Sequence, residues 1–168
     1  YHGCKKIVIV NGNAQANRPP MNIAANKLAN ETNAEVVVVD PWDMGDSVSR
    51  ELMAGEPGSM GHASQHECSQ MLYLHPHLCD MSQAEANVWP QGNFKYSDHY
   101  VFGDRAFFAK TPEAFRAATE PSGTFGDPAH CTPEKGERFH RVIVENIVKL
   151  IGQLRKTEVE IRPRRFVF

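Results

Sequence analysis

The densest group of side chains able to do chemistry lies between residues 61 and 69. His62 and His66 are one helical turn apart, and Glu67 follows directly. This spacing lets two imidazoles reach one metal ion, although an isolated histidine pair is more often surface decoration. A Glu67 carboxylate buried among the apolar residues that follow would need a cation or a hydrogen-bond donor. We therefore expect Glu67 to be a stronger candidate for a functional residue than the histidine pair.

A second group consists of amide side chains. Asn11-Gly12 ends an apolar run, and Asn13, Gln15 and Asn17 follow within a few residues. Amides supply both hydrogen-bond donors and acceptors, yet Asn and Gly are also ordinary turn residues. On local grounds a binding loop and a plain turn are equally good interpretations.

The elements that would position these groups form a strand, helix, strand unit. Residues 5–10 and 35–39 are β-branched apolar runs, typical of parallel strands covered on both faces. Between them, Pro19-Pro20 predicts a helix entered through proline. Ligands of such sheets collect where the strands end, which is where Asn11 and Asp40-Pro41-Trp42 lie.

The remaining segments differ in how clearly their sequence predicts secondary structure. Thr132-Pro133-Glu134, followed by apolar residues at 3–4 spacing, predicts a helix over about 133–155. We also predict a loop over 45–61, a helix over 63–74, loops and short strands over 82–128, and a last strand over 158–168. Asp127 is expected to cap the turn at Gly126-Asp127-Pro128.

Composition and net charge indicate the class of protein and the partners that it is suited to bind. The 168 residues are 41% hydrophobic and carry a formal net charge of -2, which fits one globular domain and does not favour nucleic acid or an anionic membrane as a partner. No apolar run approaches the length of a membrane span. The four cysteines show no paired spacing, so we expect reduced thiols and a cytoplasmic protein.

Four groups of residues follow one another in a recognisable order. They are Asn11-Gly12 with Asn17 and then Trp42; His62-Ala63 with Glu67 and Ser69; His75-Pro76 through Asp80-Met81; and Ser122 through Pro128 with Glu134-Lys135-Gly136. Together they resemble the creatininase (creatinine amidohydrolase) family over residues 2–155. The resemblance implies an α/β, three-layer fold with a mostly parallel sheet.

The resemblance also implies a metal-dependent hydrolase that opens a C–N bond in a small amide or cyclic amide. Members usually hold two divalent ions, so a Zn, Mn or Fe cofactor is expected here, as a pair of ions or as a single ion. His62 matches an active-site histidine, Glu67 is retained, and Trp42 matches an aromatic near the substrate. We therefore predict His62 and Glu67 as catalytic residues, with Asn13, Gln15 and Trp42 binding substrate.

Two departures from the family pattern reduce the expected metal affinity. Asn13 replaces a histidine ligand, and Gln15 replaces a carboxylate. Carboxamides are poorer ligands than imidazole or carboxylate for zinc or manganese. We predict that Glu67 remains a metal ligand and that His66 compensates as a new one. Gly58-Ser59 stands where creatininase itself has Trp-Asp, which argues against creatinine as the substrate.

The family's main ligand motif is absent from these residues. We therefore expect residues 1–168 to be the C-terminal portion of a single creatininase-like domain. A second polypeptide, either a cleaved product or a separate gene product, would carry the N-terminal half within a higher oligomer. Two alternatives remain open: a metal-poor lyase or isomerase that uses His62 and Glu67 as acid and base, and a non-catalytic subunit.

Overall fold

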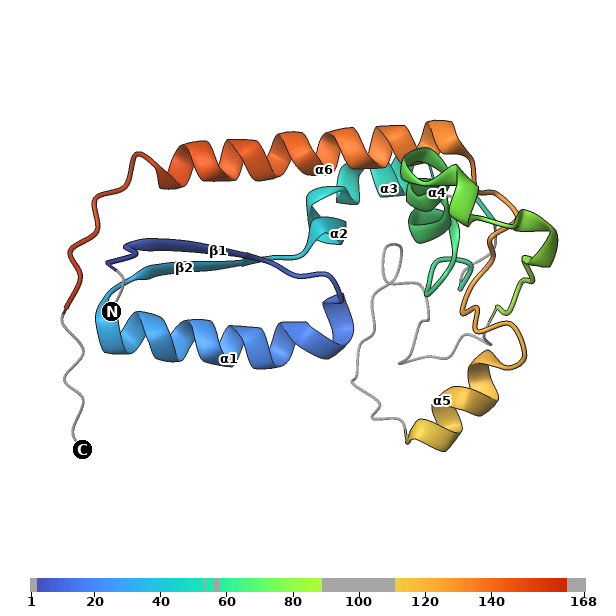
Figure 1. The fold of residues 1–168 in the computed structure, drawn as a ribbon, viewed down its shortest axis with the longest axis horizontal. Coiled ribbons are helices and arrows are strands. Elements are labelled where there is room, and N and C mark those ends of the chain that lie inside the picture. The colour runs from blue at the N-terminus through green and yellow to red at the C-terminus, as the bar shows by residue number, and fades with distance from the viewer. Residues whose placement is uncertain (1–2, 53, 56–57, 89–110, 163–168) are drawn as a thin grey trace. The chain divides into compact units, whose positions relative to one another are not determined.

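The computed structural model describes residues 3–52, 54–55, 58–88 and 111–162, without the side chains of residues 14–16 and 118 (Figure 1). The chain divides into two compact units. Unit 1 comprises residues 1–45 and 142–168, and unit 2 comprises residues 46–141. The long helix α6, Pro133–Leu154, contributes residues to both ranges.

Unit 1 contains the predicted strand, helix, strand motif. Strands β1 (Lys6–Val10) and β2 (Glu35–Val39) pair in parallel, from Lys6 opposite Glu35 to Val10 opposite Val39. Helix α1, Ala14–Thr32, connects them and runs alongside the two strands (Figure 1). The α/β class with a parallel sheet is thereby confirmed.

Helix α1 begins before the prolines that were expected to open it. The amide of Asn17 already donates to the carbonyl of Asn13 at 3.2 Å, so a helical turn exists ahead of Pro19 and Pro20. Both prolines therefore lie inside the helix, where each lacks the N–H that would donate to the carbonyl four residues earlier. The helix ends at Thr32, and Asn33 takes the left-handed conformation, with φ 60°, that is common just after a helix.

The rest of unit 1 follows β2 and closes its core. The short helix α2, Pro41–Met44, starts directly after Asp40, and the Asn146 side chain of α6 donates to the Met44 carbonyl at 2.8 Å. Among the described residues of unit 1, the buried apolar side chains are those of Ala25, Ala34, Val39, Ile143 and Leu154. The strand side chains of β1 and β2 are mostly only half-buried.

Unit 2 is helical in its described residues. It contains α3 (Asp46–Leu52), α4 (Gln65–Leu74), two 3₁₀ turns (Pro76–Leu78 and Met81–Gln83), α5 (Pro112–Thr119) and the start of α6. As expected, Thr132 caps α6, because its Oγ1 accepts from the Lys135 amide at 3.2 Å. Phe139 of α6 and Met60 form the most buried apolar part of this unit.

Several predicted segments differ from the structure. The expected loop over 45–61 contains α3, and the expected loops and strands of 82–128 contain α5, whose Thr111 cap accepts from the Ala114 amide at 3.2 Å. Residues 89–110 lie outside the described residues. No strand forms over 158–162, and the remainder of that predicted strand is not described. Among the described helices, none is both long and apolar enough to cross a membrane.

Candidate functional site

The turn that leads into α4 is built by its own side chains. Ser64 Oγ accepts from the Gly61 amide at 2.8 Å and donates to the Gly61 carbonyl at 2.7 Å. Ala63 has φ 52°, a left-handed conformation that is uncommon for a residue with a Cβ. Gly61 is required here, because a Cβ would come within 2.1 Å of the Phe125 carbonyl oxygen. These contacts fix the backbone between His62 and Glu67.

His62 and Glu67 meet across this turn. The Nδ1 atom of His62 lies 3.3 Å from Oε2 of Glu67, and the same oxygen accepts a hydrogen bond from the Ala63 amide at 2.6 Å. The side chains are 63% and 35% exposed respectively, so both are accessible to a small molecule. The structure therefore brings together the two residues that we predict to be catalytic.

This pair has the composition of an acid-base centre. A carboxylate beside one ring nitrogen orients the imidazole, which leaves Nε2 to exchange a proton with a substrate. The Ala63 amide holds the carboxylate in place through Oε2. Proton transfer to or from a small molecule at the Nε2 atom of His62 is the chemistry that this arrangement can perform.

His66 occupies a different environment on the same helix. Its side chain is 2% exposed, and its ring packs edge-on against Phe139 with 4.4 Å between the ring centroids. Burial lowers the pKa of His66 from 6.5 to about 4. The imidazole is therefore neutral near pH 7 and packed in the core of unit 2. Its role as a metal ligand stays a prediction.

The described residues do not by themselves assemble a metal centre. No group of three or more His, Cys, Asp or Glu side chains within them is arranged to hold an ion. The His62–Glu67 pair offers at most two ligands, and the Glu67 oxygen nearest the imidazole already accepts the Ala63 amide. A divalent ion at this site would thus need ligands from elsewhere.

Unit 1 contains a second polar cluster, at the carboxyl ends of β1 and β2. Asn11 is fully buried and donates from Nδ2 to Oδ1 of Asp40 at 2.5 Å. Arg18 of α1 donates from Nε to the other Asp40 oxygen. Its Nη2 atom also donates to Asp43, at 2.6 Å. The Asp40 side chain is only 4% exposed, so its charge is balanced by Arg18 inside the protein.

This cluster positions the start of the amide-rich segment, residues 11–17, that follows β1. Oδ1 of Asn11 accepts from the Asn13 backbone amide at 3.0 Å, which is an Asx turn. Asn13 is exposed, and Trp42 is half-buried on α2. The Gln15 side chain lies outside the described residues. Because these three positions belong to unit 1 and His62 and Glu67 to unit 2, their predicted grouping in one substrate site stays a prediction.

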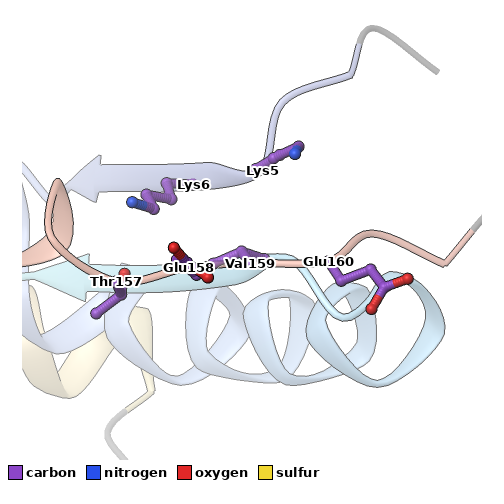
Figure 2. Close-up of a pocket in the computed structure, with 6 residues that line it drawn as sticks. All are labelled: Lys5, Lys6, Thr157, Glu158, Val159 and Glu160. Carbon is purple, nitrogen blue, oxygen red and sulfur yellow. The ribbon is translucent and has the colours of Figure 1, made fainter.

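Two cavities border unit 1. One of about 580 Å³ separates the start of β1 from the segment after α6, and Figure 2 shows Lys5 and Lys6 above Thr157, Glu158, Val159 and Glu160. Its lining holds none of the predicted site residues. A smaller cavity of about 250 Å³ is lined by residues that include Arg18, Asp40 and Asp43. The polar cluster at the strand ends therefore borders an open space.

Sequence reasoning did not single out Arg18 or the Asn11–Asp40 pair. The strand register contains a signal for the pair, since Val10 pairs with Val39 and the next residues of the two strands are Asn11 and Asp40. A carboxylate that follows a buried strand, opposite an amide, is expected to be bonded to it. The contribution of Arg18 depends on the helix start at Ala14, which the prolines concealed.

Several solved structures match this chain. A crystal structure of creatinine amidohydrolase matches with a TM-score of 0.63 and 25% identity, covering 94% of this chain and 59% of that one. A putative creatinine amidohydrolase from Bacteroides fragilis NCTC 9343 matches with a TM-score of 0.66 and 24% identity over 93% of this chain and 56% of its own. A manganese creatininase matches with a TM-score of 0.62, 24% identity, and 93% and 59% coverage.

The chain therefore spans less than two thirds of the length of these structures. No curated protein sequence matches it. The family model described as "Creatininase: Creatinine amidohydrolase" matches residues 1–151, which is most of the chain. The fold, the order of the sequence motifs and this match lead to one conclusion: the chain belongs to the creatininase family.

Proposed function

We propose that the chain is part of an enzyme that hydrolyses a C–N bond in a small amide or cyclic amide. The observation that carries this proposal is the His62–Glu67 pair, 3.3 Å apart and accessible, on a creatininase fold. Family membership supports amidohydrolase chemistry in general. The pair supplies a plausible proton donor and acceptor within this chain.

Each residue of the pair has a distinct task. His62 exchanges the proton that the leaving nitrogen needs when the C–N bond breaks, because an amine or amide leaves readily only after protonation. Glu67 orients the His62 ring through its contact with Nδ1. Asn13, Gln15 and Trp42 bind the substrate, through amide hydrogen bonds and an aromatic surface.

We propose a divalent metal as the cofactor, with most of its ligands outside the described residues. Matched structures are described as a manganese creatininase and a Zn-Zn type creatininase variant. Such ions polarise a carbonyl and lower the pKa of bound water. Glu67 is the carboxylate of this chain that could join them, and Asn13 and Gln15 are poor replacements for the ligands that the family pattern carries.

We further propose that a second polypeptide completes the fold within a higher oligomer. The described sheet has two strands, and most of their Ile and Val side chains are only half-buried. On α6, Val144, Val148 and Ile151 are exposed, and their spacing places them on one face. Two-stranded sheets are marginal by themselves, so additional strands and a cover for this face would stabilise the unit.

The test uses Glu67→Gln in the assembled protein. Small cyclic and linear amides, creatinine among them, are screened for release of a carboxylate and an amine. On a hydrolysed substrate, Glu67→Gln should lower kcat by roughly 10²–10⁴-fold, which is the usual contribution of a positioned acid or base. Glutamine can still accept the Ala63 amide, so the fold is retained. Glu134→Gln, an exposed carboxylate on α6, is the matched control.

Two results would contradict the proposal. If Glu67→Gln keeps more than about a tenth of the wild-type kcat, the pair is not the acid-base centre. If no amide is hydrolysed by the metal-loaded assembly while an elimination or isomerisation of the same compounds is catalysed, the lyase or isomerase alternative replaces the hydrolase.

A further inference from the structure

Two cysteine thiols meet beside the start of α4. The sulfur of Cys68 donates to the Ala63 carbonyl at 3.1 Å, and the sulfur of Cys131 lies 3.7 Å from the next carbonyl, that of Ser64. The two side chains therefore approach the same turn from different parts of unit 2. The interaction between the two thiols lowers the pKa of Cys68 and raises the pKa of Cys131.

The backbone around the two thiols is fixed independently of them. The Thr132 amide, directly after Cys131, donates to Ser69 Oγ at 3.2 Å. Gly136 lies so close to the Ser69 carbonyl that a Cβ there would come within 1.8 Å of the oxygen. The segment that carries Cys131 is thus held against the helix that carries Cys68, and the thiol contact does not depend on a mobile loop.

The other two cysteines lack this arrangement. Cys4 is exposed near the start of the chain, and the thiol of Cys79 donates within its own turn, to the His75 carbonyl at 3.7 Å. Cys68 and Cys131 are half-buried, so a small oxidant can reach them. A disulfide has an S–S distance of about 2.05 Å, and the two sulfurs already lie against the carbonyls of two consecutive residues, Ala63 and Ser64.

From this geometry we propose that Cys68 and Cys131 form a redox-active pair that a peroxide closes into a disulfide. One thiolate attacks a peroxide oxygen, and the O–O bond breaks to give a sulfenic acid and hydroxide. The second sulfur then attacks the sulfenyl sulfur, the S–O bond breaks, and the oxygen leaves as water with the thiol proton. In total, two thiols and hydrogen peroxide give one disulfide and two waters.

A disulfide between Cys68 and Cys131 would form beside the His62–Glu67 pair. Cys68 directly follows Glu67, whose carboxylate contacts His62 and the Ala63 amide. The Ala63 carbonyl in turn accepts the Cys68 thiol, so disulfide formation would remove a contact within the turn that holds the His62–Glu67 pair. The inference itself rests on the two thiols and is independent of the reaction that the protein catalyses.

The test is performed on the full chain with Cys4 and Cys79 replaced by serine, so that two thiols remain. Hydrogen peroxide should lower the free-thiol titre from two to zero, and the intact mass should fall by two hydrogen atoms. A non-reduced tryptic digest should join the peptide of residues 51–95 to that of residues 117–135. Dithiothreitol should restore both thiols.

Matched variants identify the partners. Adding Cys131→Ser should abolish the mass loss and instead leave Cys68 with added oxygen, as sulfenic or sulfinic acid. The wild-type chain, which keeps all four cysteines, should give the same joined peptides and retain two free thiols, and fragmentation of the joined peptides should assign the bond to Cys68 rather than to Cys79. Added oxygen without cross-linking in the two-thiol chain, or a cross-link in wild type that involves Cys4 or Cys79 instead, would overturn the proposal.

Discussion

Glu67 has a structural and a chemical role in the same carboxylate. One oxygen accepts the Ala63 amide that precedes α4 and also faces Nδ1 of His62. Helix-capping carboxylates commonly occupy this position, three residues after the cap, so the contact alone could be purely structural. The Glu67→Gln experiment separates the two roles because glutamine retains a carbonyl oxygen for the amide and loses the charge.

His66 makes folding stability depend on pH. Its pKa is about 4 in the folded chain and near 6.5 when unfolded, so the unfolded state binds more protons between these values. The contribution of His66 to the free energy of unfolding is therefore fully present above pH 6.5 and is lost as the pH falls toward 4. Urea titrations should show a loss of about 2 kcal/mol from pH 7 to pH 5 that is absent in His66→Gln.

The control for this prediction is the exposed His77. His77→Gln should keep the full pH dependence of the wild-type chain. A pH dependence that is equal in all three proteins would show that His66 is not its source.

Asn13 is the position at which metal affinity can be tested. It stands where the family pattern has a histidine ligand, and its backbone is already fixed by Asn11. If the assembly binds a divalent ion nearby, Asn13→His should raise the metal content per assembly, because imidazole binds zinc and manganese better than a carboxamide does. Elemental analysis and turnover are measured on the same preparation, with Asn17→His as the control.

The remaining outcomes for Asn13→His are also informative. Lower turnover with unchanged metal content would assign Asn13 to substrate binding. No change in either quantity would show that Asn13 is only a turn residue, and the predicted role would be wrong.

Helices α4 and α6 approach each other through Gly136. A Cβ at this position would lie 1.8 Å from the Ser69 carbonyl oxygen and 2.9 Å from Cβ of Tyr73, so Gly136→Ala forces the two helices apart. We expect a loss of about 3 kcal/mol in the free energy of unfolding, the upper end for overpacking. Urea denaturation followed by circular dichroism measures it.

The same helix provides the matched control. Gly152 has open space where its Cβ would be, so Gly152→Ala should stabilise the chain by about 1 kcal/mol through helix propensity alone. Equal effects of the two substitutions would mean that the close approach at Gly136 is not real.

Element prediction succeeded where a local signal dominated. The β-branched runs predicted both strands, and Thr132-Pro133-Glu134 predicted the start of α6, because these residues determine local geometry by themselves. The same signal, Thr111-Pro112-Glu113, precedes α5 but was hidden in a segment without clear periodicity. Pro19 and Pro20 misled because proline favours the first position of a helix, whereas this helix begins at Ala14 and continues through both prolines.

The candidate site was predictable only within short stretches of chain. The spacing of His62 and Glu67 within one turn allowed their contact to be inferred, whereas the His66 ring is removed from the surface by Phe139, far away in sequence. The expected cap at Asp127 is confirmed, since its Oδ1 accepts from the Ala129 amide at 2.8 Å. Long-range partners such as Arg18 and Asp40 depend on tertiary packing, which periodicity does not report.

At the scale of the whole molecule, the exposed apolar face of α6 allows a test of assembly. If a second polypeptide covers Val144, Val148 and Ile151, the isolated chain should self-associate through this face in sedimentation velocity experiments. Val148→Lys should reduce that association, whereas Gln153→Lys, which adds the same charge at an exposed polar position of α6, should not. A monodisperse monomer that is indifferent to both changes would count against the covered face.

The Asn11–Asp40 pair has a consequence for how the protein can change over evolutionary time. The Asx turn depends on the buried Asn11 side chain, which is bonded to Asp40, and residue 13 enters this turn through its backbone amide. A substitution at 13 therefore keeps that bond, whereas a substitution at 11 or 40 alone removes a buried hydrogen bond and leaves its partner without it. Related chains can thus carry different side chains at 13, and with them different chemistry at the strand ends, on the same turn.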